Sequence, residues 1–218
     1  MYKYELHCHT GCVSRCGRVE PKRIVELYKQ HNYNGIVVTD HYSPMTFTPN
    51  WNPQKQIDFY LEGYRRMKRA AGDDFTVLLG MELRHYASAD DYLIYGVTEE
   101  FLYNAGNLMM CGVPKMRKFC DENGFLLMNA HPFRPLRTRC NPKYLHGIEV
   151  YNGKTPKKEN DKALEWARKN SKIMVSGSDF HVEKHVARGG IITKNPIENN
   201  KQLLNILKNG DYSLVKSE

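Results

Sequence analysis

Two histidines separated by one residue stand near the start of the chain, in the segment ELHCHT. His7 and His9 come at the end of a segment that predicts a short β-strand. Side chains on a strand alternate between its two faces, so both imidazoles point to the same side. A single histidine is more often a surface or core residue, but two imidazoles aimed at one point can bind a metal ion. The spacing therefore suggests a metal site.

Other predicted strands also end in side chains that bind metals. The further ligand candidates are Asp40 and His41 in VVTDHY, Glu82 in GMEL, His131 in NAHP, and Asp179 and His181 in SGSDFH. In a β/α barrel the carboxyl ends of the strands converge on one face, where active sites are built. Each residue alone has a structural explanation, such as a turn for Asp40 or an ion pair with Arg84 for Glu82. Five strands that all end this way are better explained by one shared site.

The types of these side chains indicate which ions they would hold. Imidazole and carboxylate ligands without thiolate suit Zn, Mn or Fe better than Mg or Ca alone. The set is too large for one tetrahedral ion and sufficient for two or three. Clustered carboxylates would also repel one another unless cations neutralised them. We therefore predict two or three divalent metal ions as cofactors.

Short apolar segments alternate with segments of helical periodicity. The expected strands are 3–8, 35–39, 76–82, 92–97, 125–130, 147–151 and 173–178. The expected helices are 21–31, 54–71, 114–123, 158–170 and 199–209. This order predicts parallel β/α units, and the number of strands favours a TIM-like barrel over an open sheet. Residues 1–218, with no repeat or linker, are expected to form a single domain.

Composition is that of an ordinary globular protein, with 41% hydrophobic and 26% charged residues. No apolar run reaches roughly 18 residues and the N-terminus is polar, so we expect neither a membrane span nor a secretory signal, and a cytoplasmic location. Six cysteines in such a chain are expected to be reduced thiols. Cys8, Cys12 and Cys16 lack the C-x2-C spacing of zinc ribbons, which disfavours a cysteine cluster.

The net charge of +8 and the pI of about 9.1 favour anionic partners, including phosphate esters and nucleic acid. Positive charge gathers in three clusters: Arg65, Arg66, Lys68 and Arg69; Arg134, Arg137, Arg139 and Lys143; and Lys154, Lys157 and Lys158. We expect the first and third clusters to be solvated faces of helices.

The ordered motifs ELHCHT, VVTDHY, GMEL, NAHPFRP, GIEVYNG and SGSDFH resemble those of the PHP (polymerase and histidinol phosphatase) family, from residue 5 to about 190. The resemblance implies a distorted (β/α)7 barrel with a two- or three-metal site at the strand ends, and hydrolysis of phosphate esters. It implies that His7, His9, a bridging Glu82 and Asp179 hold the first ion. It implies His131 for the second ion, and His41 and His181 for the third.

The chain departs from the family pattern at two places. A His or Asp usually follows the paired histidines to serve the third ion, but here VSRCG offers Arg15 or Cys16. Many members carry a His at the fourth strand, whereas ADDYLIYGVTEE offers Asp91 or Thr98. The first ion is therefore expected to be fully liganded. The second and third lack ligands, which His85, Cys16, substrate or water could replace, or fewer than three ions bind.

We expect a phosphatase that attacks a phosphate monoester with a hydroxide bridging two metal ions, because metal-bound water ionises near neutral pH. The predicted catalytic residues are Asp179, His181 and Arg134. Guanidinium groups bind phosphate through paired hydrogen bonds, so Arg134, Arg15 and Arg188 are the predicted phosphate contacts.

The expected substrate is a small phosphorylated molecule, similar to histidinol phosphate or a nucleotide. One alternative is an exonuclease or phosphodiesterase acting on oligonucleotide ends, which the positive charge favours. Another is a metal-binding module without catalysis, since ligands are missing. A metal-dependent amidohydrolase is disfavoured, because no lysine ends an early strand to form a bridging carbamate.

Overall fold

The computed structural model describes residues 1–86 and 88–217. Its strands are β1 (Tyr2–Cys8), β2 (Gly35–Val38), β3 (His41–Tyr42), β4 (Thr76–Arg84), β5 (Asp91–Tyr95), β6 (Leu126–Asn129), β7 (Gly147–Asn152), β8 (Ile173–Gly177), β9 (Gly189–Thr193) and β10 (Tyr212–Lys216). Its α-helices are α1 (Pro21–Gln30), α2 (Pro53–Ala71), α3 (Glu99–Asn104), α4 (Val113–Asn123), α5 (Lys157–Lys169) and α6 (Asn200–Asn209). Short 3-10 turns lie at Leu108–Met110, Pro142–Tyr144 and Glu183–His185.

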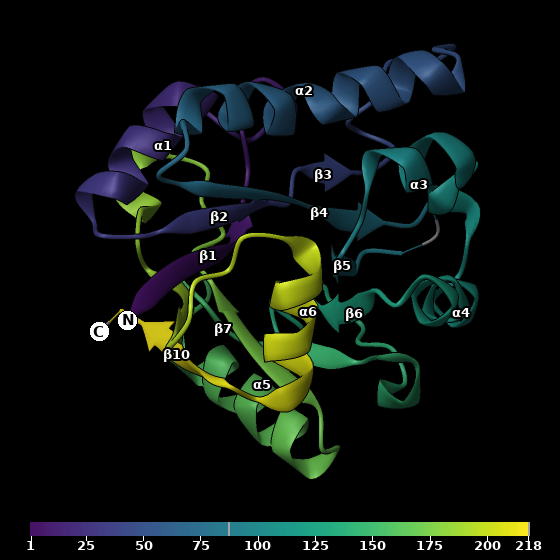
Figure 1. The fold of residues 1–218 in the computed structure, drawn as a ribbon. Helices are drawn as coiled ribbons and strands as arrows, with labels where there is room; N and C mark the ends of the chain where they lie inside the picture. The colour runs from purple at the N-terminus through teal and green to yellow at the C-terminus, as the bar shows by residue number, and fades with distance from the viewer. Residues whose placement is uncertain (87, 218) are drawn as a thin grey trace.

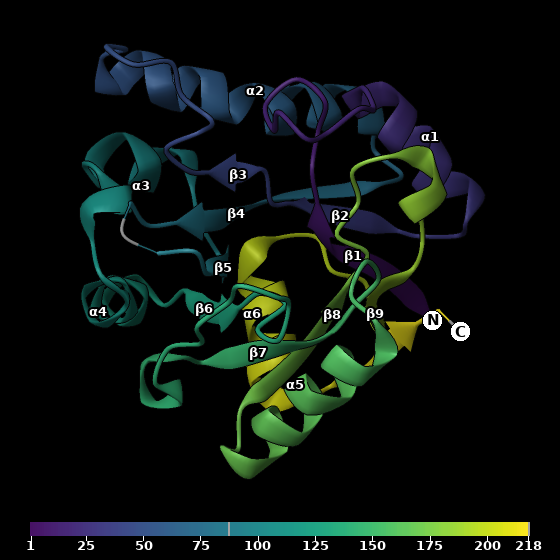
Figure 2. The ribbon, with the colours of Figure 1, turned by 180° about the vertical axis from the view of Figure 1, so that it is seen from behind.

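All the strands form one sheet in the order β10-β9-β1-β2-β4-β5-β6-β7-β8, with β3 paired to β4. The sheet curls until β8 approaches β1. Backbone hydrogen bonds join the segment after β8 to β1, from the Phe180 N–H to the His7 carbonyl (3.1 Å) and from the His9 N–H to the Phe180 carbonyl (3.0 Å). Figures 1 and 2 show the resulting barrel from opposite sides. The predicted distorted barrel is therefore confirmed.

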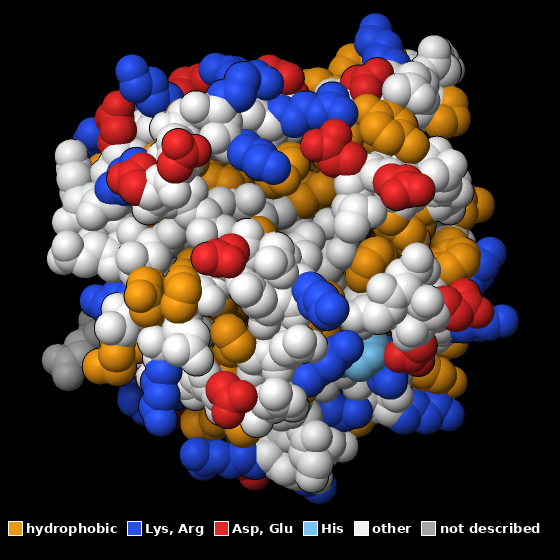
Figure 3. Space-filling view, in the orientation of Figure 1, with side chains coloured by type: hydrophobic (Ala, Val, Ile, Leu, Met, Phe, Trp, Pro, Cys, Tyr) orange, Lys and Arg blue, Asp and Glu red, His pale blue; other side chains and the backbone are white. Residues whose placement is uncertain are grey.

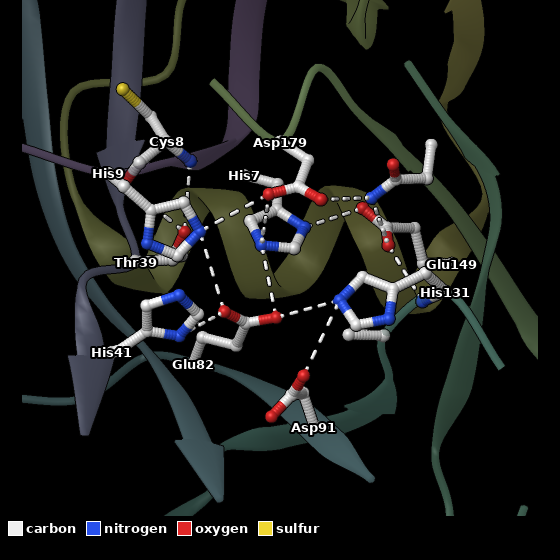
Figure 4. A network of polar contacts seen from close by, with 12 residues as sticks. His7, Cys8, His9, Thr39, His41, Glu82, Asp91, His131, Glu149 and Asp179 are labelled. Carbon is white, nitrogen blue, oxygen red and sulfur yellow. Dashed lines mark hydrogen bonds and ion pairs between the residues drawn. The ribbon is translucent and has the colours of Figure 1, made fainter. Parts of the chain in front are cut away.

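The helices pack around the barrel as their apolar faces require. Helices α1 and α2 cover one side and α5 the other (Figures 1 and 2). Inside the barrel, Leu6, Leu93 and Leu126 belong to one core cluster with Leu203 and Leu207 of α6. Helix α6 thus packs against the barrel core and lies behind the site residues in the view of Figure 4. None of the described helices is both long and apolar enough to cross a membrane.

Each predicted helix is confirmed to within a residue or two at its ends. Helix α1 begins at Pro21, a good first position because proline lacks the N–H that would be unpaired there. The side chain of Asn52 caps α2 by accepting a hydrogen bond from the Lys55 N–H at 2.8 Å. Helix α4 ends at Gly124, which has the left-handed φ of 73° that glycine adopts without strain.

The prediction of uniformly parallel strands is wrong for β5. This strand is antiparallel to both β4 and β6. The connection from β4 to β5, residues 85–90, is too short for a parallel crossover, which needs about a dozen residues. Antiparallel pairing therefore places the start of β5, at Asp91, on the same edge as the carboxyl ends of β4 and β6. Helix α3, strand β3 and the antiparallel pair of β9 and β10 are also absent from the elements predicted from the sequence.

Candidate metal centre

The paired histidines of β1 lie at the centre of a cluster that collects the other strand ends (Figure 4). Most of the predicted metal ligands converge there: His7, His9, His41, Glu82, His131, Asp179 and His181. They come from β1, β3, β4 and the segments that follow β6 and β8. The carboxyl-terminal edge of the barrel thus brings together residues separated by most of the chain, as predicted.

Glu82 bridges two halves of this cluster. Its Oε1 lies 3.3 Å from Nε2 of His7 and 3.0 Å from Nε2 of His131. Its Oε2 lies 3.4 Å from Nε2 of His9 and 2.6 Å from Nδ1 of His41. One carboxylate therefore faces four imidazoles with its two oxygens divided between them, which is the arrangement of a ligand shared by two cations.

Asp179 supplies the second central carboxylate. Its Oδ1 lies 3.6 Å from Nε2 of His7, 3.4 Å from Nε2 of His9 and 3.2 Å from Nδ1 of His181. Three sets of ligand atoms, each within 4.8 Å of one another, could hold an ion: His7, His9 and Asp179; His7, Glu82 and His131; and His9, His41 and His181. We call His7, His9, Glu82, His131 and Asp179 the inner cluster.

The inner cluster contains buried atoms that require a partner. Nε2 of His7 and Nε2 of His9 are both buried and have no hydrogen-bond partner of proper geometry among the described residues. Buried polar atoms are nearly always paired, because an unpaired one costs free energy. Both atoms point toward the space between Glu82 and Asp179 (Figure 4). A divalent cation fits this donor set, since it would accept both imidazole lone pairs and neutralise both carboxylates.

A buried carboxylate orients His7. Oε1 of Glu149 lies 2.8 Å from Nδ1 of His7, and Oε2 accepts hydrogen bonds from the His131 N–H and the Asn152 side chain, each at 2.9 Å. With the proton on Nδ1, Nε2 presents its lone pair to the cluster. Glu149 lies in the motif GIEVYNG and is not among the site residues predicted from the sequence. Its signal in the sequence is a charged residue within an otherwise apolar strand.

Asp40 does not join the ligands, so its prediction as a metal ligand is not supported by the geometry. Its Oδ1 accepts hydrogen bonds from the Thr10 N–H (2.7 Å) and the Ser14 hydroxyl (2.6 Å), and its Oδ2 accepts from the Thr10 hydroxyl (2.7 Å). Oγ of Ser14 lies 3.2 Å from Nδ1 of His9. Asp40 therefore acts through Ser14, fixing His9 with Nε2 toward the cluster.

Charge inside the cluster is strongly redistributed. Burial opposes protonation of His7, but Glu149, Asp179 and Glu82 outweigh it and raise the pKa of His7 well above its usual value. Burial, together with His181 and His41, lowers the pKa of His9 well below its usual value. Burial would raise the pKa of Asp179, but His7 and Arg134 lower it well below the ordinary range. The carboxylates are therefore ionised and need cations nearby.

Two ligands have backbone conformations that side chains other than glycine rarely adopt. His131 has a φ of 27° and Asp179 a φ of 53°. Positive φ costs free energy for such residues and is retained where the surrounding structure holds it. The His131 N–H bonded to Glu149 provides such a restraint. Both side chains are thereby turned inward immediately after their strands.

Two cations border the inner cluster. The Arg134 guanidinium donates through Nη2 to Oδ2 of Asp179 (2.5 Å) and to Oδ1 of Asn152 (2.6 Å). Nζ of Lys154 lies 3.2 Å from Nδ1 of His181 and 3.7 Å from Oδ1 of Asp179. Lys154 is exposed, as expected for this cluster, but its ammonium group reaches the ligands instead of lying on a helix face. It precedes α5 and turns into the site.

Neither of the other two predicted phosphate contacts forms a hydrogen bond or ion pair with a ligand among the described residues. Arg15 is exposed in the loop after β1. Arg188 donates to the Gly153 carbonyl at 3.1 Å and packs against the turn after β7. On α2, by contrast, the expected solvated face is confirmed, since Arg65 pairs with Glu99 and Arg66 pairs with Glu20. Blue and red side chains are mixed along this edge in Figure 3.

Asp91 begins β5, the strand at which the family pattern has a His that this sequence lacks. Oδ2 of Asp91 lies 3.7 Å from Nε2 of His131. The same carboxylate forms ion pairs with Arg84 (2.6 Å) and Arg137 (2.9 Å), which compete with any ion. His85, the other candidate, lies against Tyr92 with ring centroids 5.6 Å apart and is in none of the three ligand sets.

The cysteines do not form a cluster of their own. All six are free thiols, and Cys8 points away from the metal ligands into the core (Figure 4). Cys16 differs, because His181 and His41 act on the charge of its thiol. Burial alone would raise the pKa of Cys16, but these two imidazoles outweigh it and lower the pKa to about 6.

Comparison with known proteins agrees with this architecture. A family model described as PHP-associated matches residues 157–212. A search of curated proteins finds no match. Among solved structures, PsfC from Pseudomonas syringae PB-5123 is similar over 100% of this chain and 93% of its own, with a TM-score of 0.70 and 16% identity. The family match confirms the predicted resemblance to PHP proteins in that part of the chain.

Two further structures share the fold. One is a candidate metal-dependent phosphoesterase from Bifidobacterium adolescentis, with a TM-score of 0.57 and 14% identity over 94% of this chain and 95% of its own. The other is a lesion-specific endonuclease, EndoQ, from Pyrococcus furiosus, with a TM-score of 0.65 and 14% identity. The similarity to EndoQ covers 98% of this chain but 57% of the endonuclease. These similarities confirm the barrel fold.

Proposed function

We propose that the protein is a metal-dependent phosphoesterase that hydrolyses a phosphate monoester of a small molecule. The observation that carries this proposal is the inner cluster. Four ring nitrogens face the bridging Glu82, and two of them are buried without a hydrogen-bond partner among the described residues. These donors need cations to complete their contacts, and they lie at the edge of a barrel where active sites form. Both features support metal-assisted hydrolysis.

The residues of the three ligand sets would hold the ions. His7, His9 and Asp179 would hold the first, and His131 with the shared Glu82 the second, with His41 and His181 at a third position. Bound divalent ions polarise a phosphoryl oxygen and make water a nucleophile near neutral pH.

The chain's own residues position the ligands and the substrate. Glu149 and Ser14 hold the rings of His7 and His9 so that both Nε2 atoms face the same space. Arg134 holds the Asp179 carboxylate in place, and its guanidinium remains our candidate for contact with the phosphoryl group. Lys154 adds a second cation on the same side. Their charge would offset charge that develops on phosphoryl oxygens.

Burial of the ligands favours a terminal phosphate. The side chains of His7, Glu82, His131 and Asp179 are at most 2% exposed, while that of His41 is 22% exposed. The ligands are therefore reached from the partly exposed side chains at their edge, and a phosphate at the end of a small molecule reaches buried ligands more readily than the middle of a duplex. The similarity to EndoQ and the positive charge support the second candidate, hydrolysis of oligonucleotides.

The test combines metal analysis with turnover. The protein is purified without added ions, its metal content is measured by elemental analysis, and hydrolysis of an aryl phosphate is followed with added Mn or Zn. We expect two or more ions per chain and turnover that depends on them. One ion or none, without turnover of any ester, would instead support a binding module.

Salt dependence then separates the two substrate classes. A nuclease that uses basic residues loses affinity steeply as salt rises, because binding releases counterions from the nucleic acid. A small phosphate held mainly by ions and two side chains should depend weakly on salt. Faster hydrolysis of single-stranded oligonucleotides than of any small monoester would overturn the small-molecule proposal.

A further inference from the structure

The loop that follows β6 carries, at a spacing of three residues, His131, Arg134 and Arg137. Successive turns set this spacing, because the Arg134 N–H donates to the His131 carbonyl and the Arg137 N–H to the Arg134 carbonyl, each at 3.2 Å. Arg134 reaches Asp179, and Arg137 reaches Asp91, whose Oδ2 lies 3.7 Å from Nε2 of His131. In the view of Figure 4 these two carboxylates lie on opposite sides of the inner cluster. One loop thus places guanidinium groups at two edges of the metal ligands.

A second arginine approaches Asp91 from strand β4. Arg84 lies two residues after Glu82, so both side chains point to the same face of the strand. Nε and Nη2 of Arg84 donate to the two oxygens of Asp91 at 2.6 and 2.7 Å. Nη2 of Arg137 lies 2.9 Å from Oδ2 of the same residue. A single carboxylate therefore faces two guanidinium groups.

This arrangement leaves positive charge and hydrogen-bond donors in excess. A guanidinium has about five N–H donors, whereas a carboxylate accepts at about four lone-pair sites. Arg84 alone already pairs with both oxygens of Asp91, so Arg137 adds charge that Asp91 does not need. The Asp91 side chain is 1% exposed, while those of Arg84 and Arg137 are 24% and 16% exposed. The two arginines can therefore bind another anion from solvent while the carboxylate stays buried.

Further contacts hold Arg137 in place before any substrate binds. Thr138 donates through its N–H (2.7 Å) and its hydroxyl (2.5 Å) to the two oxygens of the buried Asp90, which fastens the loop to the start of β5. Leu136 and Arg139, on either side, have positive φ values of 67° and 58°. Such conformations persist where the surrounding structure holds them. The loop therefore presents Arg137 in a fixed position.

We propose that Arg84 and Arg137 bind a second anionic group of the substrate at the Asp91 edge of the inner cluster. The inference rests on the proposed phosphoesterase function and deepens it by naming the substrate class. The phosphate to be hydrolysed would lie at the inner cluster. A carboxylate or a further phosphate, a few carbon atoms away, would lie against the two guanidinium groups, which form paired hydrogen bonds with either anion.

Binding of unreactive phosphonates tests this inference apart from turnover. The full chain is loaded with Mn²⁺ and titrated by calorimetry with phenylphosphonate, with meta- and para-carboxyphenylphosphonate, and with the corresponding phenylene bisphosphonates. We expect a probe with a second acidic group to bind at least about tenfold more tightly than phenylphosphonate, because a hydrogen bond between charged groups contributes such a factor. Whether the carboxylates or the bisphosphonates gain more identifies the anion that the pair of arginines accepts.

Substitutions within one loop assign the effect to Arg137. Arg137→Gln should remove most of the preference for the second acidic group. Arg137→Lys should keep part of it, since a point charge remains without paired hydrogen bonds. Arg139→Gln is the matched control, because it removes the same charge from an exposed side chain of the same loop, whose guanidinium lies 4.7 Å from the Phe133 ring centre. This variant should keep the preference of the wild type.

Circular dichroism checks that each variant is folded, and the comparison of probes in the wild type does not depend on any variant. Equal affinity of the wild type for all the phosphonates, or equal lack of affinity, would overturn the second anion site while metal-dependent hydrolysis of an aryl phosphate still supported the phosphoesterase. An equal loss of preference in Arg137→Gln and Arg139→Gln would likewise remove Arg137 from the site. Absence of phosphonate binding together with absence of metal-dependent hydrolysis would overturn both proposals.

Discussion

The inner cluster and the two imidazoles at its edge, His41 and His181, share their chemistry but are supported in different ways. In the inner cluster, His7 is fixed by the buried Glu149 and His9 by Ser14, and the ligands have almost no contact with solvent. At the edge, the side chain of His41 is 22% exposed and that of His181 is 8% exposed. Ion binding in the inner cluster should therefore matter for both folding and chemistry, and at the edge mainly for specificity.

The largest expected effect is loss of an inner ligand. Asp179→Ala and His131→Ala should each lower kcat/KM for an aryl phosphate roughly a thousandfold or more, about 4 kcal/mol, because ion binding fails. His181→Ala, at the edge of the cluster, should cost less. Circular dichroism checks that each variant is folded. Activity near that of the wild type in either inner variant would contradict the ligand assignment.

Removal of metal should destabilise the protein because of the inner carboxylates. Without ions, Glu82 and Asp179 are buried anions compensated by histidines, Arg134 and Lys154. A ligand at a hundred times its dissociation constant stabilises by about 2.7 kcal/mol, or roughly 5–10 °C in melting temperature for a chain of this size. Scanning calorimetry before and after chelation measures the shift. An unchanged melting temperature in verified metal-free protein would show that the cluster is stable without ions.

Substitution of Glu149 tests whether the hydrogen bond that orients His7 affects metal affinity. Glu149→Gln keeps the size of the side chain but weakens acceptance of the His7 Nδ1 proton, so metal affinity should fall by roughly 10- to 100-fold. A competition titration against a chromophoric chelator gives this value. Glu165→Gln, on the exposed face of α5, is the matched control and should leave the affinity unchanged. Equal affinities in the two variants would remove Glu149 from the site.

The sequence predicted most of this fold because its signals are local. Periodicity and end residues such as Pro21 and Gly124 locate the helices, since these preferences act within one turn. The reversal of β5 depends on pairing with two strands, although the short connection at residues 85–90 was available as a signal. The pair β9 and β10 has little apolar alternation, and it is held by contacts with β1 that only the fold creates.

The ligands were predictable and their partners were not. His7 and His9 are marked by spacing within one strand, whereas Glu149 and Ser14 support them across the sheet and along a loop. Asp40 differs from its neighbour His41, which does enter the site, because the direction of the Asp40 side chain is set by Thr10 and Ser14. Sequence proximity thus locates a site but does not decide which side chains face it.

Lys154 is expected to show the smallest effect, on substrate binding alone. Its side chain is 29% exposed and reaches the rim between Asp179 and His181. A flexible ammonium group suits a phosphate as a point charge. Lys154→Gln should raise KM about tenfold, corresponding to about 1.4 kcal/mol, with a smaller change in kcat.

Two further variants decide whether charge at this position is what matters. Lys154→Arg should recover most of the lost affinity, because it keeps a cation at the rim. Lys158→Gln removes the same charge from the exposed face of α5 and should leave KM unchanged. An equal rise in KM for Lys154→Gln and Lys158→Gln would mean that substrate binding depends on net charge alone. The distinction between an inner cluster that binds ions and a rim that binds substrate would then not hold at Lys154.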